Sequence, residues 1–145
     1  MELSSVQLLA NRLLKVHKLD KKGWRFRFDR AKRRAGSCRF SDKEITIAKA
    51  YAEQENLKEI TNTILHEIAH ALVGPKDAHN EIWKQKALEI GCDAERCHDV
   101  VFSKPKYKLT CGNNCFEVTR YRVNKEFLQS RICSRCKGKL LLIEI

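Results

Sequence analysis

The opening stretch of the chain spaces its hydrophobic side chains as an amphipathic helix does. Between residues 3 and 19, leucines such as Leu9 and Leu13 recur at intervals of three and four positions, which places them on one face of a helix. Ser4 or Ser5 is a residue type that favours the N-cap position. The spacing therefore predicts a capped helix over 3–19 with one face against a core.

The next stretch alternates hydrophobic and polar side chains, which is the pattern of a strand. Trp24, Phe26 and Phe28 are separated by arginines, so a strand here would turn an aromatic face inward and a basic face outward. Two more short strands are expected at 38–40 and 44–48. This order of elements favours an α+β fold, with helices packed on a small antiparallel sheet.

Two further helices are predicted near the centre of the chain. From 57 to 73, hydrophobic residues nearly encircle the helical wheel, which indicates a helix that is buried on most sides. Gly74 and Pro75 then end it. A shorter helix is expected over 79–90, with Trp83 on its apolar stripe, and the tight Gly-Pro turn would fold it back against the first.

The first of these two helices carries the pattern His66-Glu67-Ile68-Ala69-His70. Histidines four residues apart leave a helix from the same face, about 6 Å apart along its axis, so both rings can bind one zinc ion. Polar groups inside an apolar helix need partners, and a metal ion would satisfy them. Glu67 stands beside the two rings and could act as general base on an attacking water. The pattern predicts the catalytic zinc of a zinc peptidase.

Two residues compete for the third position around that zinc. His79 falls one turn before Trp83, on the face of the second helix that would turn inward. Glu89 is the alternative, because some zinc peptidases take a glutamate from a following helix, but it lies on a less apolar side. His79 is the preferred ligand. Lys76 stands where the extended metzincin motif has its third histidine, which excludes that signature.

The segment over 104–145 contains two close pairs of cysteines. Cys111 and Cys115, then Cys133 and Cys136, each suit a tight turn that presents two thiolates to one ion. Strand-like runs surround both pairs, so we expect a β zinc ribbon with a structural zinc that is closed to substrate and needed for folding. Two disulfides are the competing interpretation, which the lack of an export signal disfavours.

The other cysteines give weaker signals. Seven cysteines make an odd number, which argues against a fully paired disulfide framework. Cys38 and Cys92 are expected in the core, because cysteine is often a small buried residue. Cys97 and His98 lie in a polar connector without a visible partner pair, so their role stays open.

Length and hydropathy limit the class of protein. A chain of 145 residues suits one domain with a small appendage, which we place at 1–103 and 104–145. No apolar run approaches the roughly 18 residues of a membrane span, and the beginning of the chain lacks a signal-peptide pattern. We therefore expect an intracellular monomer without a membrane partner, cytoplasmic or nucleoid-associated (nuclear in a eukaryote).

Positive charge is concentrated in two segments. The formal net charge is +11; residues 21–39 carry nine Lys/Arg against one acid, and residues 104–145 carry ten against three. Such concentration suggests a polyanionic partner, most simply nucleic acid, although solvated faces can also be basic. Tyr107 and Tyr121 could stack on bases. The expected nucleic-acid contacts are Arg25, Arg27, Arg30, Lys32, Arg33, Arg34, Lys106, Lys108, Arg120, Arg122, Arg135 and Lys137.

The ordered combination of these features resembles the SprT-like metalloproteases, whose best-known type is Spartan. The resemblance rests on the strand at 24–28, the basic stretch Asp-Arg-Ala-Lys-Arg-Arg-Ala-Gly, the His-Glu-Ile-Ala-His helix, the histidine after it and the four-cysteine ribbon. It implies a zincin-like domain in which His66, His70 and His79 hold the catalytic zinc and Glu67 is the base.

The same resemblance implies two Zn²⁺ ions per chain and a ribbon that helps to bind DNA. Family members with established activity cleave proteins attached or crosslinked to DNA, and DNA binding promotes the cleavage. We expect single-stranded or junction-containing DNA rather than a specific duplex. Two positions depart from the family pattern: three residues separate the first cysteine pair where two are common, and Asn80 follows His79 where glycine is frequent.

Two other functional classes stay open. The chain could be a non-proteolytic DNA-binding or regulatory protein with a vestigial or structural zinc site in its helix. It could also be a metal-dependent hydrolase of a non-protein substrate. The intact Glu67 argues mildly against the first alternative, because a structural zinc site needs no general base.

Overall fold

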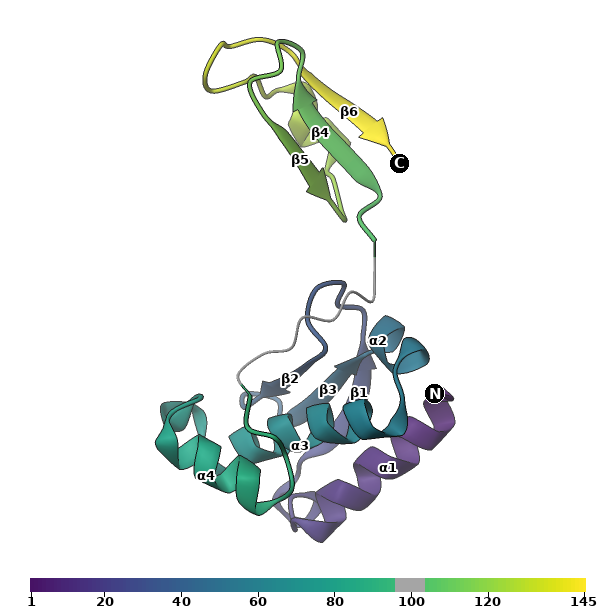
Figure 1. Cartoon of the computed structure of the whole chain (residues 1–145), viewed down its shortest axis with the longest axis vertical. Helices are drawn as coiled ribbons and strands as arrows, with labels where there is room; N and C mark the ends of the chain where they lie inside the picture. The colour runs from purple at the N-terminus through teal and green to yellow at the C-terminus, as the bar shows by residue number, and fades with distance from the viewer. Residues whose placement is uncertain (96–103) are drawn as a thin grey trace. The chain divides into compact units, whose positions relative to one another are not determined.

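The computed structural model describes residues 1–95 and 104–145 (Figure 1). The chain divides into two compact units, Met1–Phe102 and Ser103–Ile145, and each has its own sheet. The assignment of separate functions to 1–103 and the remainder stays a prediction. No helix among the described residues combines the length and the apolar composition needed to cross a bilayer.

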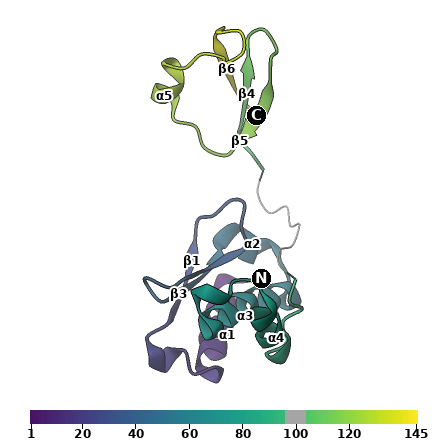
Figure 2. The same cartoon turned by 90° about the vertical axis from the view of Figure 1, so that its left-hand side faces the viewer.

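The first unit packs helices on a small three-stranded sheet, as Figure 2 shows. This arrangement confirms the predicted α+β class. Its described helices are α1 (Leu3–Val16), α2 (Lys49–Gln54), α3 (Leu57–Val73) and α4 (Glu81–Glu89), with 3-10 turns at Asp20–Lys22 and Pro75–Asp77. Its strands are β1 (Arg25–Asp29), β2 (Gly36–Arg39) and β3 (Glu44–Ala48).

The sheet of this unit is mixed, so the prediction of an antiparallel sheet is wrong. Strand β3 lies in the centre, parallel to β1 and antiparallel to β2. The chain reverses between β1 and β2 and again between β2 and β3, so the first and third strands run in the same direction. The alternation of side chains along one strand carries no information on that direction. All residues of β3 from Ile45 to Ala48 are buried, as suits a central strand.

Helix α1 is shorter than predicted, and only part of its predicted hydrophobic face, including Leu14, is buried. It ends at Val16, which is exposed, and Leu9 and Leu13 are only partly buried against the core. The predicted serine cap is wrong, because Glu2 occupies the N-cap position and makes no side-chain cap bond. Side chains four residues apart share one helix face. The buried positions of α1 are Val6, Ala10 and Leu14.

Helix α3 begins and ends where the sequence pattern predicted. Asn56 caps it by accepting a hydrogen bond from the Glu59 backbone nitrogen at 3.0 Å. Gly74 ends it with φ at 92°, a conformation that glycine adopts without steric cost. The helix contacts the sheet, α1 and α4, so it forms the centre of the core. Its fully buried aliphatic residues include Ile60, Ile64 and Ile68.

Gly36 allows strand β2 to lie close to α3. A Cβ atom at this position would meet the Thr46 carbonyl oxygen at 2.8 Å and the Thr63 methyl group at 3.3 Å. Gly36 is the first residue of β2 and pairs with Ile47. Glycine is therefore needed for a close backbone approach, and β2 lies beside the helix that carries the histidines.

The second unit is a small antiparallel sheet with one short helix. The strand-like run between the two cysteine pairs forms a strand of only four residues. The helix that follows was missed, because five residues are too few to show a periodic pattern. Asn124 caps this helix by accepting a hydrogen bond from the Phe127 nitrogen at 3.1 Å. The elements are β4 (Tyr107–Cys111), β5 (Glu117–Arg120), α5 (Lys125–Gln129) and β6 (Leu140–Glu144), with β4 in the centre.

Asp29 is a buried carboxylate that ties the first sheet to the basic loop over 30–35. It accepts hydrogen bonds from Thr46 Oγ1 at 2.7 Å, from Arg34 Nη2 at 2.9 Å and from the Ala31 nitrogen at 2.9 Å. Only 8% of Asp29 is exposed, so these donors replace the water that it loses on folding. The loop is thereby held at the end of β1.

Replacing Asp29 by alanine should destabilise the first unit, because Thr46 would lose its buried acceptor. Such a loss costs roughly 1–3 kcal/mol. Asp42→Ala is the matched control, since its ion pair with Arg39 is about half exposed and exposed pairs contribute about 0–1 kcal/mol. Urea unfolding followed by circular dichroism compares the variants. Equal free energies of unfolding for both would contradict the structural role of Asp29.

Candidate metal centres

Helix α3 presents two histidines and a glutamate within little more than one turn. His66 and His70 are half-buried, and the centroids of their rings lie 5.1 Å apart, as the helical repeat of about 3.6 residues requires. Glu67 is more deeply buried, with 8% of its surface exposed. A rigid helix therefore fixes the two imidazoles and the carboxylate relative to one another.

His79 reaches these rings from the turn before α4, whereas the sequence pattern placed it inside that helix. Asn80 is the N-cap of α4 and accepts a hydrogen bond from the Trp83 nitrogen at 3.1 Å; it also donates to Asp77 Oδ1 at 2.9 Å. Capping explains why asparagine suits this position. His79 has φ at +55°, which residues other than glycine rarely adopt and which is common at functional sites.

The three imidazoles bring their Nε2 atoms together. His79 Nε2 lies 3.1 Å from His66 Nε2 and 3.0 Å from His70 Nε2. A neutral ring nitrogen carries one hydrogen or one lone pair in its plane, so His79 Nε2 can form a hydrogen bond with only one of these neighbours. Zinc binds imidazole nitrogens at about 2.0–2.1 Å, which in tetrahedral geometry separates them by roughly 3.3 Å. The donors and their spacing therefore fit a zinc ion.

Trp83 packs against all three histidine rings. It is fully buried, and its ring centroid lies 4.6 Å from that of His66, 5.1 Å from His70 and 4.8 Å from His79. Its indole nitrogen donates to the His66 carbonyl at 3.4 Å. The sequence placed Trp83 in the core but gave no sign that it orients the ligands, because this contact depends on how α4 packs on α3.

Burial determines the protonation of this cluster. It lowers the pKa of His70 to about 4, and the nearby His79 acts in the same direction, so the ring is neutral near pH 7 and able to bind metal. Burial raises the pKa of Glu67 to about 8, and the charge of Arg34 opposes the rise. A divalent cation favours the ionised carboxylate. A divalent cation bound by the three histidines would therefore keep the Glu67 carboxylate ionised and available as a base.

Glu89, the alternative third ligand, takes no part in this cluster. Its side chain is 67% exposed and pairs with Lys86 at 3.1 Å. Among the described residues, the donor atoms that lie within 4.8 Å of one another here belong to His66, His70 and His79. The geometry therefore favours His79 over Glu89 as the third ligand.

Four cysteines of the second unit form the other candidate centre. The Sγ atoms of Cys111, Cys115, Cys133 and Cys136 all lie within 4.8 Å of one another. Asn113 supports them: its backbone nitrogen donates to Cys111 at 3.3 Å and its side-chain amide to Cys136 at 3.4 Å. The sequence pattern did not single out Asn113, although its place between the first two cysteines fits a donor to thiolates. Four ligands on two turns fit a closed structural zinc site.

These cysteines are free thiols, like the other described cysteines. Cys111 and Cys136 are 3.3 Å apart, whereas a disulfide requires about 2.05 Å, so the disulfide interpretation is not supported. Amide donation from Asn113 lowers the pKa of Cys136 to about 6, while contact with Cys136 raises the pKa of Cys115 to about 12. Neighbouring thiolates repel one another, and a bound cation would remove this conflict.

Two of the remaining cysteines lie where the sequence predicted. Cys92 is buried and Cys38 is half-buried against the core. Burial, with the charge of Glu67 as a second cause, raises the pKa of Cys38 to about 12, so it is an un-ionised thiol on the strand beside α3. Cys97 and His98 lie outside the described residues.

Several of the predicted nucleic-acid contacts already have partners within the protein. Arg120 and Arg135 donate to backbone carbonyls. Three ion pairs join Arg27 to Glu44, Arg34 to Asp29, and Lys108 to Glu117. The others are exposed and make no ion pair with a described residue: Arg25, Arg30, Lys32, Arg33, Lys106, Arg122 and Lys137. The charge available to a partner is therefore smaller than the sequence count.

Removing His79 should empty the first centre while leaving the second occupied. His79→Ala deletes the nitrogen that lies closest to both other rings, and we expect zinc content to fall by about one ion per chain. Glu89→Ala is the matched control and should keep full zinc content. Plasma mass spectrometry of purified protein measures this. A loss of zinc in the Glu89 variant alone would reverse the ligand assignment.

The second unit should depend on its cysteines for folding. Within 104–145, the described residues that are buried are Cys111 and Cys133, so little hydrophobic core is present. Cys133→Ser should therefore lower zinc content by about one ion and make this segment sensitive to protease. Cys38→Ser is the control and should change neither. If the Cys133→Ser variant lacked this zinc ion and still resisted protease as the wild type does, the structural role of the metal would be contradicted.

Comparison with protein families agrees with this geometry. The model of the SprT-like family matches residues 5–103. Searches of curated proteins and of solved structures each gave no significant match. The matched range is more than half of the chain and contains His66, Glu67, His70 and His79. The chain therefore belongs to the SprT-like family.

Proposed function

We propose that this chain is a zinc-dependent endopeptidase that acts on proteins bound or crosslinked to DNA. The observation that carries the proposal is the convergence of three imidazole nitrogens, two of them from a helix that also holds a buried glutamate. Membership of the SprT-like family supports it, because that family implies a zinc metallopeptidase.

The residues of the first centre have separate roles in peptide hydrolysis. A zinc ion held by His66, His70 and His79 would polarise the scissile carbonyl and lower the pKa of the attacking water. Glu67 accepts the proton of that water on its carboxylate and can pass it to the leaving amine. Because Glu67 is 8% exposed, few competing waters reach the proton while it is held. Trp83 keeps the histidine rings in place through its contacts with all three.

The two centres differ in the number of protein ligands, and this difference supports separate roles. Three histidines leave a tetrahedral ion with a free position for water or substrate, whereas four cysteines complete its coordination. A general base is useful beside a centre that can bind a water molecule, and it has no function beside a centre that cannot. We therefore assign catalysis to the histidine centre and folding to the cysteine centre.

Exposed positive charge supports the DNA part of the proposal. Two groups of cations make no ion pair with a described residue: Arg30, Lys32 and Arg33 after β1, and Lys106, Arg122 and Lys137 in the second unit. Lys/Arg contacts with phosphates give binding that weakens with salt. Tyr107 and Tyr121 are half-buried and offer ring surface for unpaired bases. These features favour single-stranded or junction-containing DNA.

Replacing Glu67 by glutamine should abolish cleavage and preserve zinc content, because the amide keeps the size of the side chain but cannot accept the proton. A general base contributes about 10²–10⁴-fold in rate. The substrate is a basic DNA-binding protein crosslinked to single-stranded DNA, compared with the same protein without DNA. Gel analysis follows cleavage, and mass spectrometry follows zinc.

Glu59→Gln is the matched control, since Glu59 lies on the same helix and outside the histidine cluster; it should cleave as the wild type does. We expect cleavage by the wild type to rise with DNA present. Cleavage by zinc-loaded Glu67→Gln at the wild-type rate would disprove the mechanism. Two zinc ions and tight DNA binding without cleavage by the wild type would favour a regulatory DNA-binding protein instead.

A further inference from the structure

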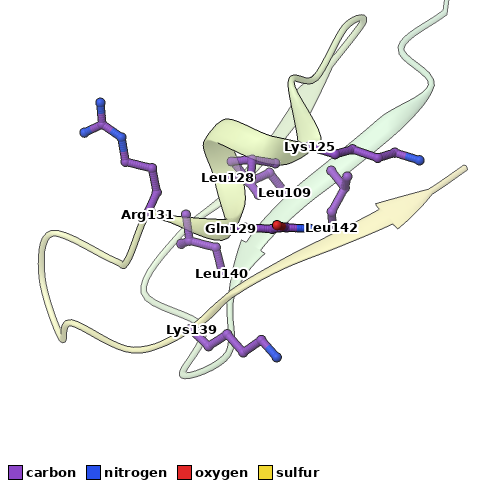
Figure 3. A pocket seen from close by; sticks show the side chains of 8 residues that line it. All are labelled: Leu109, Lys125, Leu128, Gln129, Arg131, Lys139, Leu140 and Leu142. Atoms are coloured by element: carbon purple, nitrogen blue, oxygen red, sulfur yellow. The ribbon is translucent and has the colours of Figure 1, made fainter.

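A cavity of about 250 Å³ lies between α5 and the sheet of the second unit (Figure 3). Its lining is aliphatic: Leu109 comes from β4, Leu128 from α5, and Leu140 and Leu142 from β6. Directly paired residues of neighbouring strands point to the same face, and Leu109 pairs with Leu142. One face of the sheet therefore supplies most of the lining, and the short helix covers part of it.

Three cations surround this aliphatic lining. They are Lys125, Arg131 and Lys139, and Figure 3 shows their charged ends directed away from the leucines. The cavity is lined by no carboxylate, and none of the three pairs with an acid in the described part of the chain. The Arg131 guanidinium lies 4.1 Å from the centre of the Phe127 ring. The site thus combines an apolar interior with a positive rim.

The chemistry of the lining favours a peptide side chain over a nucleobase. Protein sites that hold unpaired bases stack them on aromatic rings or on flat guanidinium groups and hydrogen-bond their edges. No aromatic side chain lines this cavity, and its one guanidinium, that of Arg131, already lies over the Phe127 ring. Gln129 is its single uncharged polar side chain. A volume of about 250 Å³ is also below the roughly 300–1,000 Å³ of small-molecule sites. It suits one anchoring side chain.

We propose that this cavity binds an acidic segment of a partner protein, with one leucine-like side chain inserted between α5 and the sheet. Carboxylates on either side of that anchor would lie against Lys125, Arg131 and Lys139. Burial of the anchor gives affinity, and the charge complementarity gives partner selectivity and a faster association. The cations used here are distinct from those proposed above for DNA. The inference does not depend on peptide hydrolysis by the first unit.

The test uses the full chain and a fluorescent synthetic peptide with one central leucine between aspartates and glutamates. Anisotropy titrations compare it with the same peptide carrying asparagine at the centre. Loss of the anchor should weaken binding by about tenfold or more. The triple variant Lys125→Gln, Arg131→Gln, Lys139→Gln should weaken binding by about tenfold.

The matched control is Lys106→Gln, Arg122→Gln, Lys137→Gln, which removes the same charge from residues that do not line the cavity. It should change peptide affinity by less than about twofold while weakening binding of single-stranded DNA. Methyl NMR of the wild type adds a direct readout, since the peptide should shift signals of Leu109, Leu128, Leu140 and Leu142. This readout does not require a variant to fold.

Three results would overturn the proposal. Equal losses in both triple variants would mean attraction by net charge alone. Shifts of the cavity leucines by single-stranded DNA, and not by the peptide, would assign the cavity to nucleic acid. Absence of saturable binding by the leucine peptide would mean that the cavity holds no such anchor.

Discussion

Helix α3 has to bury an aliphatic surface and, within the same turns, hold polar side chains together. Ile64 and Ile68 are fully buried while Glu67 is almost so, and an unpartnered carboxylate in that position is costly. The rest of the first unit follows from this requirement. Gly36 lets a strand lie against the helix, and Trp83 fills the space beneath the histidine rings. The scaffold is rigid where the chemistry needs fixed distances.

Features that depend on residues close together in the sequence could be predicted accurately. Most features that depend on contacts between distant segments could not. The bounds of α3 could be predicted because periodicity extends over 17 residues and Asn56 and Gly74 mark its two ends. The parallel pairing of β1 with β3 could not be predicted, because the sequence does not show whether β1 lies beside β2 or beside β3. The sequence placed His79 within a helix for a different reason, because the N-cap at Asn80 was not recognised. Its position follows from the cap at Asn80 and the left-handed backbone before it.

Charge counting shows a second limit of sequence analysis. The basic segments contain many Lys and Arg residues, but the fold pairs some of them with acids from neighbouring strands, as Lys108 with Glu117 and Arg27 with Glu44. These pairs form because cross-strand neighbours lie within reach of long side chains. The Lys and Arg residues without an acidic partner are the ones that remain available to a polyanion. Asn113 was missed for a related reason, because its amide meets Cys136 only after the turns have folded.

The two candidate metal centres differ in the number of side chains that they offer to an ion. Each brings ionisable groups close together: the buried Glu67 lies on the helix of His66 and His70, and four thiols lie within 4.8 Å of one another. A divalent cation would relieve both conflicts. Four thiolates would complete the coordination of a zinc ion, so that centre is suited to holding the chain together. Three imidazoles would leave one position open next to a carboxylate, and the proposed difference between a catalytic and a structural centre depends on this one ligand.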